Sequence, residues 1–216
     1  MSLRDYEDFV YRAMMIDKPD PVAAWRELSE VQQRYCDYLE AHDEIRIEAL
    51  DTELTLSVKG RKWINSDGHF NMPDGEVFTG PVETSANGYI RYTYPTVWLG
   101  RGAEDVRLWF EDGVVVRWEA REGKELLDEL FAMDDGARRI GEFAIGTNYA
   151  IPTFTKKILF DEKIGGTCHL AVGMGFPKTG SQNKSALHWD MICDLRTGAR
   201  LSADGEVFHE GGVWKI

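Results

Sequence analysis

The sequence has few cysteines and no paired cysteine motif. Its 216 residues contain three, Cys36, Cys168 and Cys193, which are far apart and form no Cys-x-x-Cys pattern. An odd number at such spacing predicts neither a disulfide framework nor a thiolate zinc site. We therefore expect a reduced, cytoplasmic protein in which Cys168 is part of the core.

Basic residues and long apolar runs are scarce as well. The 25 Lys and Arg residues face 37 Asp and Glu residues, so the net charge is −12. This balance argues against binding to nucleic acid or to an anionic membrane, because both require basic surfaces. No apolar run is long enough to span a membrane, and "MSLRDYEDFVYR" is too charged for a secretory signal peptide.

The beginning of the chain has helical periodicity. Apolar positions predict one helix over residues 3–17 and a second from about Pro21 to the mid-forties. Asp20 is expected to cap the second helix, and Pro21 suits its first turn. This helix carries an apolar stripe that we expect in the core, formed by Val22, Trp25, Leu28, Val31, Tyr35 and Leu39.

After Ala49 the pattern changes to short aromatic and β-branched runs. Asp112-Gly113 between two such runs is a strong hairpin signal, and one helix is expected at about residues 123–138. The prediction is an α+β fold: two N-terminal helices, then a mainly antiparallel β domain with one interrupting helix. We divide it into a helical segment, 1–50, and a β-rich metal-binding catalytic domain, 51–216. Later strands are expected at 140–147, 166–173, 185–195 and 200–216.

The stretch "SALHWDMICDL" places His188 and Asp190 two positions apart in a strand-like run. Alternate residues of a strand share a face, so this pair points one way while Leu187, Trp189 and its neighbours point into a core. A charge is rarely left unpaired on a buried face. The pair is therefore either a hydrogen-bonded couple at a strand edge or one wall of a metal site.

Other metal-ligating residue types interrupt strand-like runs. Glu76 and Glu142 each follow a glycine and precede an apolar residue, and few cations are close to them in the sequence. A buried carboxylate needs a counter-charge, which makes a metal a reasonable partner. Two histidines with three or four carboxylates suit one or two zinc-like ions. No HExxH motif is present, and His42, His69 and His209 are expected on the surface.

Four blocks of the sequence, in order, resemble the aminopeptidase T / aminopeptidase S family of metallo-aminopeptidases. The blocks are "GRKWINSDGHFNMPDGEVFTGPVE", "GARRIGEFAIGTN", "LFDEKIGGTCHLAVG" and "NKSALHWDMICDL". The resemblance implies a co-catalytic site for two divalent ions, zinc first, with cobalt or manganese as alternatives. It implies five metal ligands, with Glu142 bridging the ions: Glu76, Glu142, His169, His188 and Asp190.

The resemblance also carries two departures and one further site residue. Glu162 matches an acidic position of the family motif, as an additional ligand or a proton acceptor. Phe176 stands where the family has a tyrosine whose hydroxyl would assist the reacting carbonyl. Family members are about twice as long, so the chain is expected to be either a natural short relative or a shortened form that lacks an N-terminal domain.

The resulting functional hypothesis is a cytoplasmic metal-dependent aminopeptidase. It would remove N-terminal residues from peptides with a free N-terminus through a metal-activated water, and it would self-associate as a homodimer. The alternative is a folded metal-binding domain with little or no peptidase activity, because of Phe176 and the missing upstream part. A β-rich binding module without metal would require all five ligand matches to be accidental.

Overall fold

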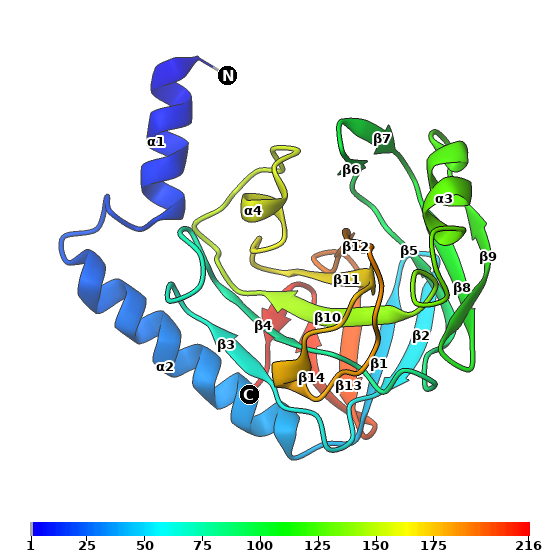
Figure 1. Ribbon diagram of the computed structural model, residues 1–216. Coiled ribbons are helices and arrows are strands. Elements are labelled where there is room, and N and C mark those ends of the chain that lie inside the picture. Colours follow the sequence, from blue (N-terminus) through cyan, green and yellow to red (C-terminus); the bar gives the residue numbers. More distant parts are fainter. Residues whose placement is uncertain (1) are drawn as a thin grey trace.

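The computed structural model describes residues 2–216, which form four α-helices, a short 3-10 helix and three sheets (Figure 1). An eight-stranded sheet has the order β15-β14-β13-β1-β2-β5-β8-β9, and a five-stranded sheet has the order β12-β11-β10-β4-β3. Every ladder between named strands is antiparallel, so the predicted α+β fold is confirmed.

The helices are α1 Leu3–Ala13, α2 Pro21–Glu40, α3 Lys124–Phe131, α4 Ile158–Asp161 and the 3-10 helix Pro177–Thr179. The strands are β1 Glu44–Ala49, β2 Thr52–Ser57, β3 Ile64–Ser66, β4 Glu76–Thr79, β5 Asn87–Arg91, β6 Thr96–Trp98, β7 Arg101–Ala103, β8 Arg107–Glu111, β9 Val114–Glu119, β10 Ile140–Gly146, β11 Thr167–Gly173, β12 His188–Asp194, β13 Arg200–Ala203, β14 Glu206–Glu210 and β15 Val213–Trp214.

The main core lies between the two larger sheets. Ile47 and Leu54 of the eight-stranded sheet belong to the same buried cluster as Phe143 and Leu170 of the five-stranded sheet. Cys168 is fully buried in this cluster, as expected. Because alternate strand residues face opposite ways, the remaining residues of β4, β10, β11 and β12 form an outer face that does not join this core.

The N-terminal helices begin as predicted and end early. The Asp20 side chain accepts a hydrogen bond from the Ala23 amide, and Pro21 occupies the first turn of α2. The prediction that α2 reaches the mid-forties is wrong. The helix ends at Glu40, and β1 follows at once, pairing with β2 and β13 in the eight-stranded sheet.

The predicted helix over residues 123–138 is also shorter than expected, because α3 ends at Phe131. Asp134 lies just beyond it, and its carboxylate accepts hydrogen bonds from the amides of Gly136 and Ala186. Such side-chain contacts offer the backbone an alternative to the helix. The Asp112-Gly113 hairpin is confirmed as the connection between β8 and β9.

The apolar stripe of α2 does not lie in the core as expected. Leu39 is fully buried, but Val22 is 59% exposed and Trp25 is half-buried. Helix α2 packs along β3 and β4 at one side of the molecule, and α1 projects away from its N-terminal end (Figure 1). The buried residues of α2 are Gln32, Cys36 and Leu39, so Leu39 is the one stripe residue that is buried. No helix in the described part of the chain is long and apolar enough to cross a membrane.

Candidate metal centre

The outer face of the five-stranded sheet carries all five residues expected as metal ligands. Glu76 comes from β4, Glu142 from β10, His169 from β11, and His188 and Asp190 from β12. Along these strands the ligand-type side chains are flanked by side chains of the core, as Asp190 is by Trp189 and Met191. The alternation predicted for β12 therefore places His188 and Asp190 on the same face.

Small residues between these strands leave a hollow on that face. Ala171 of β11 lies between Glu142 and Asp190 in the cross-strand register, and Ala144 of β10 is the partner of His169. The register also shifts between Ile140 and Glu142, which marks a bulge at Gly141. Bulges re-aim neighbouring side chains and are common beside functional sites.

Glu142 lies between the two histidines and offers one oxygen to each. His188 Nε2 is 3.3 Å from Glu142 Oε2, and His169 Nε2 is 3.9 Å from Glu142 Oε1. Glu76 completes the first group, with Oε2 3.1 Å from His169 Nε2. Asp190 completes the second, with Oδ2 3.7 Å from His188 Nε2. The result is two three-ligand groups that share Glu142, and a third group joins Glu162, His169 and Asp190.

These separations fit the spacing of ligands around a metal ion. Bonds of about 2.0–2.2 Å to a tetrahedral ion leave neighbouring ligand atoms roughly 3.3–3.6 Å apart. Glu76 Oε2 and Asp190 Oδ1 are buried and have no hydrogen-bond partner among residues 2–216. Buried acceptors without a partner are costly, so these atoms and the donor set together suit a divalent cation.

The orientation of His188 also suits a ligand. Its Nδ1 donates a hydrogen bond to the carbonyl of Met174 at 2.8 Å. This contact holds the proton on Nδ1 and leaves Nε2 directed at Glu142 and Asp190, the usual arrangement of a metal-binding histidine.

Lys163, which sequence reasoning missed, lies at the inner end of the cluster. Its side chain is 1% exposed, and Nζ donates hydrogen bonds of 2.6 Å to Glu76 Oε1 and to Glu162 Oε1. Few cations lie near Glu76 along the chain, but in the fold Lys163 supplies its counter-charge. Lys163 is 87 positions away in sequence, and only the pairing of β4, β10 and β11 brings it close. The sequence signal that could have identified Lys163 as part of the cluster was its position directly after Glu162.

The carboxylates of the cluster differ strongly in acidity. Burial works against charge on Glu76, but Lys163 and His169 outweigh it and lower the pKa of Glu76 to about 2. Burial and the neighbouring charge of Glu76 raise the pKa of Glu162 to about 8, against the opposing effect of Lys163. Burial also raises the pKa of Glu142, although His188 opposes it. The pair Glu162 and Glu76 can therefore hold different protonation states near neutral pH.

Both histidines carry raised pKa values in this acidic surrounding. Burial alone would lower the pKa of His169, but Glu76 and Asp190 raise it to about 9. Burial is likewise outweighed at His188, where Glu142 and Asp190 raise the pKa to about 9. A metal ion that binds these nitrogens must therefore displace protons.

A cavity of about 310 Å³, which we name the acidic cavity, opens over the cluster. Phe176 lies in its wall, with its ring 5.0 Å from His188 and 5.6 Å from Phe78. The loop that carries Phe176 is fixed by Glu83, which accepts hydrogen bonds from the Gln182 amide and from Arg61. The cavity therefore combines carboxylates with an aromatic wall.

The other histidines lie away from this cluster. His69 is exposed and pairs with Asp67, and His42 is half-buried at the end of α2. The expectation that His209 is a surface residue is wrong. It is fully buried beside Trp214, and the register shift in the ladder of β13 and β14 leaves both Phe208 and His209 buried. The turn-forming residues that surround His209 in the sequence had suggested an exposed position.

Comparisons with known proteins find a matching family model and several relatives. The family model of the thermophilic metalloproteases, M29, matches residues 1–214. Aminopeptidase 2 of Geobacillus stearothermophilus is 35% identical over 207 residues, covering 86% of this chain and 49% of its own length. Aminopeptidase T of Thermus aquaticus is 31% identical, with coverage of 77% and 44%. The chain thus spans about half the length of the curated relatives that it matches.

Solved structures share the fold. Wild-type AmpT from Thermus thermophilus superposes with a TM-score of 0.82 at 24% identity, covering 97% of this chain and 58% of its own. The 2,5-dihydroxypyridine dioxygenase of Pseudomonas putida KT2440 gives a TM-score of 0.70 at 13% identity, with coverage of 87% and 59%. At these identities, the two structures bear on the fold alone.

Proposed function

Because the chain belongs to the M29 family of thermophilic metalloproteases, we propose that it carries the catalytic site of a metal-dependent aminopeptidase. The observation that carries the proposal is Glu142, which offers separate oxygens to two histidine-containing ligand groups. In this proposal the β-rich catalytic domain, predicted as residues 51–216, also takes in β1 (Glu44–Ala49), which pairs with β2 and β13, and the helical part of the chain is α1 and α2.

We propose two divalent ions, zinc first, with cobalt or manganese as alternatives. Glu76, Glu142 and His169 would hold one, and Glu142, His188 and Asp190 the other. Imidazole nitrogens and carboxylate oxygens are common zinc ligands. Ions bound there supply Lewis acidity toward the peptide carbonyl and lower the pKa of water to about 7.

The substrate amine finds its counter-charge in the acidic cavity. A free N-terminus is cationic near neutral pH, and the cavity presents Asp190, while Glu162 adds negative charge once it loses its proton above its pKa of about 8. The need for a cationic amine in this cavity selects the N-terminal residue of a peptide over internal residues. The raised pKa of Glu162, about 8, also suits a group that accepts a proton near neutral pH.

The first side chain of the substrate would rest on the aromatic wall of the acidic cavity. Phe70, Phe78 and Phe176 form this wall, and Lys178 Nζ lies 3.9 Å from the centre of the Phe70 ring. Apolar and aromatic first residues fit such a surface. Phe176 provides the ring of the family tyrosine without its hydroxyl, so it offers no hydrogen bond to the reacting oxygen.

We further propose a cytoplasmic homodimer. Cys36, Cys168 and Cys193 are free and buried, which fits a reducing compartment. The exposed residues Ile16, Val22 and Met72 line a cavity of about 550 Å³ together with Trp25, a surface that suits association between copies. Sedimentation velocity tests this proposal, since a monomer at high concentration would contradict it.

The proposed activity is tested with leucine p-nitroanilide and zinc-loaded protein. We expect hydrolysis that chelation abolishes and zinc restores, and we expect Glu142→Gln to lose at least 10²-fold in kcat/KM. Glu125→Gln, which changes an exposed carboxylate of α3, is the matched control and should keep full activity. Metal binding without hydrolysis of any leucine substrate would instead support the alternative of an inactive metal-binding domain.

A further inference from the structure

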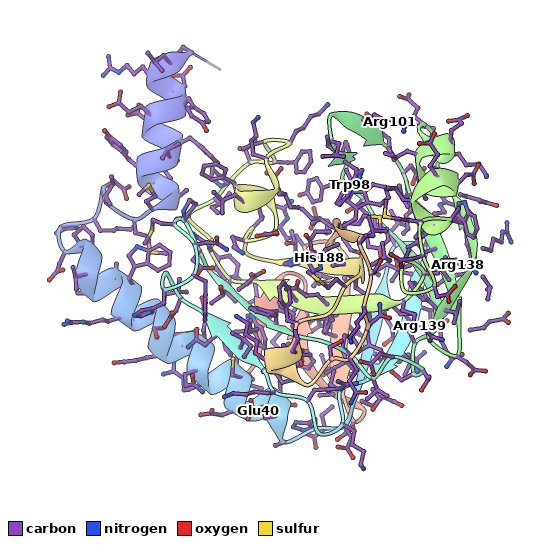
Figure 2. The ribbon with its side chains drawn as sticks, in the orientation of Figure 1. Glu40, Trp98, Arg101, Arg138, Arg139 and His188 are labelled. Atoms are coloured by element: carbon purple, nitrogen blue, oxygen red, sulfur yellow. The ribbon has the colours of Figure 1, made fainter. Side chains whose placement is uncertain are left out.

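A second cavity adjoins the metal centre and shares two lining residues with the acidic cavity. His188 and Asp190 line the acidic cavity and also a separate space of about 310 Å³ between β6, β12 and α4, which we name the basic cavity. Figure 2 shows Trp98 of β6 and His188 of β12 on neighbouring elements in the middle of the molecule. A substrate bound across the metal centre therefore has room on both sides.

The two cavities differ in charge. The acidic cavity is lined by four carboxylates of the cluster and by Lys163 and Lys178, whereas the basic cavity presents Lys156 and Lys157 with Asp161 and the shared Asp190. Lys156 and Lys157 are exposed, and no carboxylate of residues 2–216 forms an ion pair with either. Asp161 also lines this cavity, but one of its oxygens accepts hydrogen bonds from the Thr155 amide and hydroxyl.

The remaining wall of the basic cavity is mostly apolar. It is formed by Pro95, Val97, Trp98, Phe154, Ile158 and Ile192. Phe154 stacks on Tyr94, with ring centres 4.8 Å apart. An apolar wall with two lysines matches an apolar residue that carries a carboxylate.

The lysine-bearing loop is held in place. Asp161 binds Thr155, and the Lys157 carbonyl accepts hydrogen bonds from the amides of Phe160 and Asp161 at the start of α4. Lys156 has a φ of 63°, a left-handed conformation that these contacts maintain. The two ammonium groups therefore extend from an anchored backbone.

We propose that the basic cavity binds the leaving part of the substrate and that Lys156 and Lys157 bind a carboxylate there. This inference rests on the proposed function, because the amine of the peptide occupies the acidic cavity. The charges then set the direction of the peptide: the amine lies toward the carboxylates of the acidic cavity and the carboxylate toward Lys156 and Lys157. The substrate class is short peptides that carry a carboxylate within one or two residues after the cleaved bond.

The carboxylate has two chemical sources. It is either the C-terminus of a dipeptide or tripeptide, or an Asp or Glu side chain in the second position. An extended residue spans about 3.3–3.6 Å, so both sources lie within one or two residues of the cleaved bond. Matched substrate pairs separate them: Leu-Phe against Leu-Phe-amide, and Leu-Glu-amide against Leu-Gln-amide.

The experiment compares kcat/KM for each pair in the zinc-loaded protein, in Lys156→Met/Lys157→Met and in Lys184→Met, a control at an exposed position outside both cavities. We expect the carboxylate-bearing member of at least one pair to be favoured about tenfold, mainly through KM, because its charge is bound. The double variant should reduce that ratio below about twofold, and Lys184→Met should keep it.

Equal turnover within both pairs, or a tenfold ratio that survives in the double variant, would overturn the inference while leaving the aminopeptidase proposal intact. No turnover of any substrate would instead count against the proposed function. In that case calorimetric titration of Leu-Phe and Leu-Phe-amide into the zinc-loaded protein decides the inference. A Kd about tenfold lower for Leu-Phe than for Leu-Phe-amide supports the inference, and equal Kd values contradict it.

Discussion

Lys163 donates a 2.6 Å hydrogen bond to Glu76, and both residues are buried. The ammonium group compensates the buried charge of Glu76 and lowers the pKa of that carboxyl to about 2. It also binds Glu162, so one lysine holds two acidic groups at the base of the metal cluster. This lysine is expected to stabilise the metal-free fold.

Lys163→Met should therefore destabilise the metal-free protein. Removing one partner of a buried ion pair leaves an uncompensated charge and costs about 3–5 kcal/mol. Urea denaturation in the presence of a chelator measures the free energy of unfolding, and Lys184→Met is the exposed control. A loss below about 1 kcal/mol would mean that Glu76 is not charged in the metal-free protein.

Metal binding should release protons. His169 and His188 have pKa values raised to about 9 in the metal-free cluster, so both are mostly protonated at pH 7. A metal ligand must be neutral imidazole, and zinc affinity should therefore rise steadily from pH 6 to pH 9. Calorimetric zinc titrations in buffers of different ionisation enthalpy count the released protons. An affinity that does not change over this range would contradict the protonation described here.

Phe176→Tyr should raise turnover. The ring lies 5.0 Å from His188, and a hydroxyl added there would donate a hydrogen bond where charge develops on the carbonyl oxygen. We expect leucine p-nitroanilide hydrolysis to increase by about one to three orders of magnitude, with unchanged zinc content. If the melting temperature falls instead and turnover does not rise, Phe176 is a packing residue only.

His209 should make the fold sensitive to acid. Burial lowers the pKa of this imidazole from 6.5 to about 4, and neither ring nitrogen has a hydrogen-bond partner among the described residues. The folded state thus keeps His209 neutral, while the unfolded chain binds a proton below pH 6.5. Its contribution is constant above pH 6.5 and falls by about 3 kcal/mol between pH 6.5 and 4.

His209→Leu removes this titration. Denaturation curves at several pH values should show a smaller loss of stability between pH 6.5 and 4.5 than in the unaltered protein. Equal slopes in the two proteins would show that His209 is protonated in the folded state and that the burial of its ring has no such effect.

Much of the site was predictable because strand alternation is a local property. The side-chain period of two placed His188 and Asp190 on one face, opposite Trp189 and Met191, before any fold was known. The grouping of Glu76 with Glu142 required the family resemblance, since the two lie on different strands. Lys163 was missed because its contact with Glu76 depends on strand order and register, which residue spacing does not contain.

The helices show the same limit of prediction from sequence: local signals are readable, and tertiary contacts are not. Asp20 and Pro21 identified the start of α2 through a local cap, whereas the exposure of Val22 depends on how far β3 and β4 extend beneath the helix. A periodic stripe identifies the apolar side of a helix but not the length of the surface that covers it. The buried position of His209 likewise depends on the pairing of β13 with β14.

The central claim is that Glu142 bridges two metal ions held by this sheet face. Crystals of zinc-loaded protein, measured above and below the zinc absorption edge, test it directly. We expect two anomalous peaks, one beside Glu76 and His169 and one beside His188 and Asp190, with Glu142 in contact with both. A single peak, or peaks away from these side chains, would contradict the account.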